Sequence, residues 1–219
     1  DEMKLFYALD PRLTKQILGA FIVARDQDFY DAASDYSSRV WRIRSVDGPA
    51  ARMIAAGHED VYGYRFDWDE GGSFLFMDLG KVLGAGHGVE IPFVFNRFEF
   101  FGDADRIMFA KKTRDSREKL SRAMGAYWAE FARTGAPGDA GSPKWTRYGA
   151  DGDAALMRFD SEQDGGVEMM PGADSFDRLI ADLKADPRVD AEERCQIVSG
   201  IVDWVPSLEG LLSPEFGCK

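Results

Sequence analysis

The residue in this sequence with the clearest capacity for chemistry is His87, which lies in the segment 84–95. Gly86 and Gly88 flank this histidine and allow the backbone to turn sharply, so that neighbouring groups can approach the imidazole. An ordinary histidine titrates near neutral pH and is therefore suited to take a proton from a nucleophile and return it. The local pattern leaves two interpretations open: a catalytic histidine, or a polar residue of a flexible loop.

Two further polar residues give smaller hypotheses. His58 stands beside Glu59 and Asp60, but this spacing matches no known metal-ligand motif, and we interpret His58 as a solvated loop residue. Glu90 follows His87 by three residues. We interpret it either as an acid behind the histidine or as a hydrogen-bonding partner of loop amides, and not as a catalytic group.

The elements that must position His87 indicate a mixed α/β domain. The segment 61–68 is rich in β-forming and aromatic residues and predicts a strand, while the preceding segments 27–44 and 49–56 favour helices. A helix followed by a strand is the unit from which parallel sheets are built. Residues 69–100 lack helical periodicity and predict a long functional loop.

Apolar spacing and turn signals predict the rest of the chain. The clearest helix covers 116–134 and ends at Gly135. On its apolar face we expect three aromatic core residues, Tyr127, Trp128 and Phe131. The other expected elements are short helical pieces within 3–22, short antiparallel strands at 145–148, 156–159 and 167–170, and helices at 175–185 and 191–205.

The run around His87 resembles the histidine loop of the type-B carboxylesterases, the family that includes the cholinesterases and the bacterial para-nitrobenzyl esterases. The residues that carry this resemblance are Gly84, His87, Glu90, Ile91, Phe93, Val94 and Phe95. Further along, residues 127–137 resemble a helix end of the same family, and Trp145 with Tyr148 matches its Trp-x-x-Tyr element. The matches follow the order of the family over residues 1–159, and the remainder is similar only loosely.

This resemblance implies an α/β-hydrolase fold and a Ser-His-Glu triad. Glu2, in an Asp-Glu pair, fits the triad acid of the family, and it precedes His87 as the order of α/β-hydrolases requires. By resemblance, Glu2 accepts the imidazole N–H of His87 and orients the ring. Leu5 and Phe6 correspond to residues of the substrate gorge, with packing of a short helix as their alternative role. Met3 stands where the family often has a glycine.

The nucleophile of such a triad is not in this sequence. Gly-x-Ser-x-Gly does not occur, and the segment 71–74 lacks the second glycine. We therefore expect residues 1–219 to be the C-terminal part of a single α/β-hydrolase catalytic domain, the fold class being α/β. The expected partner is the N-terminal portion of the same esterase, which carries the serine. We predict that this chain is ordered only in complex with that portion, because its apolar surfaces would otherwise be exposed.

The function implied by the resemblance is hydrolysis of a small-molecule carboxylic ester through an acyl-enzyme, without a metal or organic cofactor. The alternative is a non-catalytic esterase-like scaffold used for protein binding. Relatives of that kind usually lose triad residues, so the presence of both His87 and Glu2 argues against it.

The composition of the chain limits the classes of partner that it can bind. The formal net charge is −11, and an acidic surface repels phosphates, so we expect neither nucleic acid nor an anionic membrane as a partner. Apolar runs stay well short of the roughly 20 residues that a transmembrane helix needs. The two cysteines, Cys195 and Cys218, are consistent with one bridge or with two free thiols, and they leave the compartment open.

Overall fold

The structure is a computed structural model that describes residues 8, 10–17, 21–74, 77–78, 80, 84–138, 143–149 and 155–218. The strands are β1 (Thr14–Ile17), β2 (Phe21–Ala24), β3 (Gly63–Phe66), β4 (Ser73–Phe74), β5 (Met77–Asp78), β6 (Ala155–Phe159) and β7 (Glu168–Pro171). The longer helices are α2 (Gln27–Arg42), α3 (Gly48–Ala55), α7 (Arg114–Thr134), α8 (Phe176–Ala185), α9 (Ala191–Trp204) and α10 (Glu209–Phe216). The short helices α5 (Glu90–Val94) and α6 (Asp105–Met108) follow the histidine loop.

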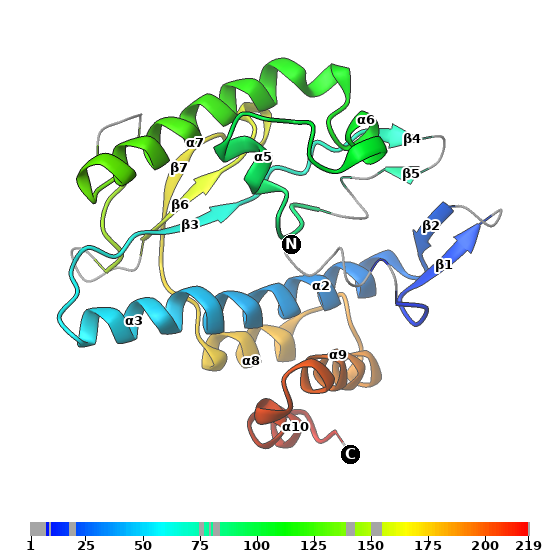
Figure 1. Ribbon diagram of the computed structural model, residues 1–219. Helices are drawn as coiled ribbons and strands as arrows, with labels where there is room; N and C mark the ends of the chain where they lie inside the picture. Colours follow the sequence, from blue (N-terminus) through cyan, green and yellow to red (C-terminus); the bar gives the residue numbers. More distant parts are fainter. Residues whose placement is uncertain are drawn as a thin grey trace.

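These elements form two layers, as Figure 1 shows. The upper layer contains the sheet of β3, β6 and β7 with α5 and α7 on it, and the lower layer is built around α2 and α3 with α8, α9 and α10 beneath them. The antiparallel hairpin of β1 and β2 lies beside the start of α2. The histidine loop therefore belongs to the upper layer and lies next to the α2 helix of the lower one.

The sheet contains one parallel pair. β3 and β6 run parallel, with Gly63 opposite Leu156 and Phe66 opposite Phe159, and β6 pairs with β7 in the antiparallel sense. The helix–strand order had predicted parallel pairing, and helices on both sides of the sheet agree with the α/β class. Parallel strands bring their carboxyl ends to the same edge, so the residues after β3 and after β6 lie close together.

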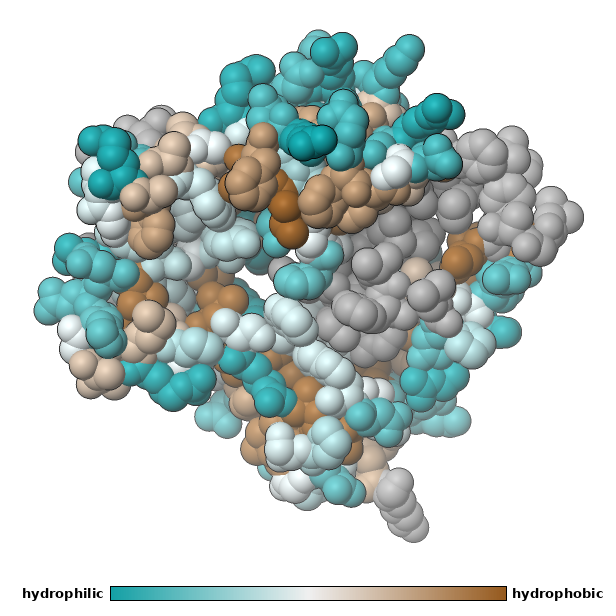
Figure 2. All heavy atoms as spheres, viewed as in Figure 1, coloured by the Kyte–Doolittle hydropathy of each residue, from teal (hydrophilic) through white to brown (hydrophobic). Residues whose placement is uncertain are grey.

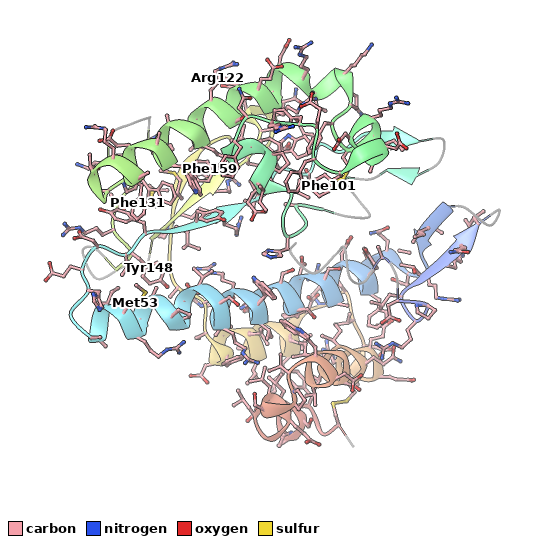
Figure 3. All side chains as sticks on the ribbon, in the orientation of Figure 1. Met53, Phe101, Arg122, Phe131, Tyr148 and Phe159 are labelled. Atoms are coloured by element: carbon pink, nitrogen blue, oxygen red, sulfur yellow. A yellow bond between two sulfur atoms is a disulfide. The ribbon has the colours of Figure 1, made fainter. Side chains whose placement is uncertain are left out.

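The upper core explains why α7 forms where it does. Its predicted apolar face supplies Leu120, Met124 and Tyr127, all buried against Phe93 of α5 and Phe159 of β6. The helix ends at Gly135, whose φ of 79° is a left-handed conformation that glycine adopts without strain. Figure 3 shows Phe159 beneath this helix. This packing fixes the layer that carries the histidine loop.

The lower core joins α2 to the C-terminal helices. Side-chain caps begin three of them: Asp26 for α2, Ser175 for α8, and Asp190 for α9, where Glu193 completes a capping box. Tyr30, Val40 and other apolar residues of α2 pack with those of α8, α9 and α10 in one cluster. A disulfide between Cys195 and Cys218 ties α9 to the residues after α10, which resolves the open question about the two cysteines.

Buried polar contacts join the end of α2 to both layers. Tyr148 donates its hydroxyl hydrogen to Oδ1 of Asp47 at 2.5 Å, and Asp47 is itself 5% exposed. Nε of Arg42 lies 2.9 Å from Oδ2 of the same carboxylate, and the guanidinium also donates to the carbonyl of Gly172 at 2.6 Å. A buried carboxylate left without partners costs free energy, so these contacts favour the observed position of the last turn of α2.

Several expectations about local structure were wrong. Residues 14–17 and 21–24 form strands and not helical pieces, because Thr14, Ile22 and Val23 are β-branched and pair across a hairpin. The segment 145–148 is not a strand. The expected loop 69–100 contains the short strands β4 and β5 and the helix α5. Of the three aromatic residues expected in the core, Tyr127 is buried but Phe131 is 47% exposed.

Candidate active site

The histidine loop is anchored by apolar residues on both sides of the histidine. Ala85 and Val89 are buried, and Phe93 is fully buried in α5. The Phe93 ring lies 5.0 Å from that of Phe66 and 4.9 Å from that of Trp68, measured between centroids. Because Phe66 ends β3 and Trp68 follows it, this contact ties the loop to the carboxyl end of the strand. Sites of open α/β sheets lie at that end of the strands.

The backbone of the loop is also held by a carboxylate. Oε2 of Glu90 accepts a hydrogen bond from the backbone N–H of Gly88 at 2.8 Å, which is the second of the two roles expected for Glu90. Gly88 has a φ of 91°, which disfavours other residues at this turn. Between these anchors the side chain of His87 is exposed. The arrangement holds the backbone of the loop and leaves the imidazole accessible to a reacting group.

Two tryptophans lie beside His87. The rings of Trp41 and His87 are 5.3 Å apart between centroids and tilted by 53°. Trp41 also stacks on Trp204, with a centroid distance of 5.9 Å and an angle of 11° between the rings. Trp41 lies on α2 and Trp204 is the last residue of α9, so three elements distant in the sequence meet at the histidine.

A cavity of about 550 Å³ lies next to this contact, between α2 and the parallel strands. Trp41 and Ala85 line it together with Tyr64 and Phe66 of β3 and Leu156 of β6. Figure 2 shows the surface hollowed between the same two layers. The cavity opens beside the histidine loop and is large enough for a small organic molecule or for several side chains of a packed segment.

The charges that line the cavity are largely neutralised within the chain. Arg39 pairs with Asp174 at 2.7 Å and with Asp182 at 2.9 Å, and Arg65 donates from Nε to Oδ1 of Asp67 at 2.8 Å. The two remaining arginines of the lining have carboxylate partners as well: Arg42 pairs with Asp47, and Arg188 pairs with Asp35 and Asp186. Paired guanidinium groups are poorly available for an anion, so this wall disfavours an anionic occupant.

Asp160 is the unusual acid of this region. It follows β6 directly, at the same edge of the sheet as Asp67, and is 7% exposed. Burial raises the pKa of Asp160 from 3.8 to about 6, although Oδ1 accepts the backbone N–H of Ser161 at 2.7 Å. The negative charge of Asp67 raises the pKa further. Groups with such shifts gather at functional sites, but buried charge alone produces them too.

The predicted site residues have different outcomes. His87 is described, and it lies exposed at the end of the parallel strands. Glu2, Leu5 and Phe6 lie outside the described residues, so the proposed acid and gorge residues stay predictions. His58 is exposed after α3. Among the residues that the structure describes, there is no group of three or more side chains suited to a metal ion, and no helix is long and apolar enough to span a bilayer.

Three residues of this region were not predicted from the sequence: Trp41, Trp204 and Asp160. Trp41 stood in an expected helix, but helical spacing does not say which ring a tryptophan will contact. Asp160 carried a weak signal, since an acid directly after a buried strand lies at the edge where parallel sheets hold their sites.

The comparisons with known proteins identify the family. The model of the carboxylesterase family matches residues 9–175, which is most of the chain. This chain therefore belongs to the type-B carboxylesterases, and the α/β-hydrolase fold implied by the resemblance applies to it. The match ends before α8, so the three C-terminal helices lie beyond it.

Curated relatives match parts of the chain. Cocaine esterase of Homo sapiens is 48% identical over 88 residues, which are 40% of this chain and 14% of that protein. Acylcarnitine hydrolase of Mus musculus is 34% identical over 134 residues, 58% of this chain and 22% of that protein. The chain thus spans a small fraction of the length of these relatives. A solved carboxylesterase of Geobacillus stearothermophilus is 23% identical, with a TM-score of 0.48, over 82% of this chain and 36% of that one.

Proposed function

We propose that this chain supplies the general base and the acid of a carboxylic ester hydrolase. Membership of the carboxylesterase family supports the reaction class. The observation that carries the proposal for His87 is local: its neighbours in the loop are buried at the carboxyl end of a parallel strand pair, while its own side chain is exposed. A proton-transfer group needs this combination of a fixed backbone and an accessible ring.

The proposed reaction has two halves. A serine carried outside this sequence attacks the ester carbonyl while His87 takes the proton from its hydroxyl group, and the same proton then goes to the leaving alcohol. In the second half, His87 takes a proton from water, which attacks the acyl-enzyme, and returns that proton to the serine as the carboxylic acid leaves. Glu2 accepts the other imidazole N–H and stabilises the imidazolium that forms in each half.

The serine would come from the N-terminal portion of the same esterase. Two observations support this proposal. Among the described strands, β3 pairs with β6 alone and so stands at the edge of its sheet, where its outer backbone N–H and C=O groups can pair with a strand of another chain segment. The relatives are also several times longer than the matched segments. We expect this chain to aggregate when it is expressed alone and to be soluble with that portion; a soluble, stable monomer without it would contradict the proposed assembly.

The test compares the two histidines of the chain. The assembled protein is assayed on a short-chain para-nitrophenyl ester as wild type, as His87→Ala and as His58→Ala, with circular dichroism to confirm folding. We expect turnover to fall by roughly 100- to 10,000-fold in His87→Ala and to stay near wild type in His58→Ala. Equal rates in wild type and His87→Ala would refute the role of His87. An inactive wild type would favour the scaffold that binds proteins.

A further inference from the structure

The ring of His87 contacts a tryptophan ring of the lower layer. The loop anchors Ala85 and Val89 fix the backbone on either side of the histidine, while the imidazole itself is exposed. Trp41 meets that ring at 5.3 Å between centroids. An indole at this distance restricts the imidazole on one side, so it limits the directions in which the ring nitrogens can point.

Trp41 is itself held from several directions. It stacks on Trp204 in an offset arrangement, with ring centroids 5.9 Å apart and 11° between the rings. On α2 it is followed by Arg42, which reaches Asp47 and the carbonyl of Gly172, and Arg39, two residues before it, pairs with Asp174. These contacts hold the last turn of the helix that carries Trp41.

Trp204 brings a segment outside the family match to this site. It ends α9, which lies beyond residue 175, where the family model stops. The core of α2, α8 and α9 and the disulfide from Cys195 to Cys218 hold α9 in place. The C-terminal helices therefore reach the histidine through one pair of stacked rings.

We propose that Trp41, backed by Trp204, is a positioning residue for His87: it selects the imidazole orientation that proton transfer requires. This inference rests on the proposed function, since it assigns to Trp41 an effect on the same general base. A ring that is displaced loses the alignment between its nitrogen and the serine, and small displacements of a catalytic group cost large factors in rate. The effect should therefore fall on the chemical step and not on substrate binding.

The kinetic test uses the assembled protein with Trp41→Phe, Trp41→Leu and Trp204→Leu. The matched control is Phe131→Leu, an exposed aromatic residue on α7 at the far side of the sheet from α2 (Figure 3). We expect Trp41→Leu to lower kcat at least about tenfold with KM within about twofold, and Trp41→Phe to recover most of that loss. Trp204→Leu should give a smaller loss, and Phe131→Leu none. A kcat within about twofold of wild type in Trp41→Leu would overturn the proposal.

A second measurement separates this inference from the proposed function. The proton resonances of the His87 imidazole are recorded in a His58→Gln background, where His87 is the one remaining histidine of this chain. With the imidazole protons of this chain selectively labelled, we expect the His87 signals to shift in Trp41→Leu through the loss of the indole ring current, and to stay in place in Phe131→Leu. Unchanged signals would overturn the positioning contact even if His87→Ala is inactive. If the signals shift but His87→Ala stays active, the contact exists and the proposed function is wrong.

Discussion

Replacement of Asp160 by asparagine should stabilise the protein above neutral pH. Burial raises the pKa of this carboxyl from 3.8 to about 6, so the folded state binds the proton more tightly than the unfolded chain does. The stabilisation by that proton is fully present below pH 3.8 and is lost as the pH rises through 6. Asparagine keeps an oxygen that can accept the N–H of Ser161 and carries no charge at any pH.

The size of the effect follows from the same two pKa values. The gap between pKa values of 3.8 and about 6 predicts that the free energy of unfolding of Asp160→Asn exceeds that of the wild type by about 3 kcal/mol at pH 8. About 1.4 kcal/mol of this difference develops between pH 5 and pH 8. Urea unfolding followed by tryptophan fluorescence at both pH values measures it, with Asp103→Asn as an exposed control. A difference between variant and wild type that is the same at pH 5 and pH 8 would refute the linkage.

Three other perturbations have defined outcomes. Cys195→Ser with Cys218→Ser should lower the free energy of unfolding by about 3 kcal/mol, because the bridge closes a loop with a separation of 23 residues; urea unfolding in the absence of reductant checks this. Phe93→Ala should cost about 3–5 kcal/mol and also lower esterase activity, since this buried ring anchors the histidine loop; thermal unfolding and turnover measure the two effects. Hydrogen bonds from Arg188 hold the pKa of Asp186 at about 2, so Arg188→Ala should remove about 2 kcal/mol of stability at pH 6 and progressively less as the pH falls below 4, as acid titration would show.

The histidine loop was predictable because its signals are local. Gly84, Gly86 and Gly88 around one histidine, followed by an acid and an aromatic run, lie within a few residues of one another. The strand before it and the helix 116–134 were found for the same reason, since alternation and helical spacing are properties of short segments. Family resemblance rests on the same local matches.

The rest depended on contacts between distant segments. The spacing of apolar residues in 3–22 suits a helix, but pairing of Thr14 with Ala24 across a hairpin overrode it. The sequence does not show which ring the indole of Trp41 contacts, because Trp204, on which it stacks, comes from the distant helix α9. The raised pKa of Asp160 comes from its burial in the folded protein, which a single sequence does not specify. Glu2 lies outside the described residues, and its role follows from resemblance alone.

The most direct test of the central claim is covalent labelling of the serine that His87 is proposed to activate. The assembled protein is treated with a fluorophosphonate as wild type, His87→Ala and His58→Ala, and the labelled peptide is identified by mass spectrometry. We expect the label on a serine outside these 219 residues, with a labelling rate at least about 100-fold lower in His87→Ala and unchanged in His58→Ala. Labelling at the wild-type rate in His87→Ala would contradict the account, because the serine would then be activated by another base.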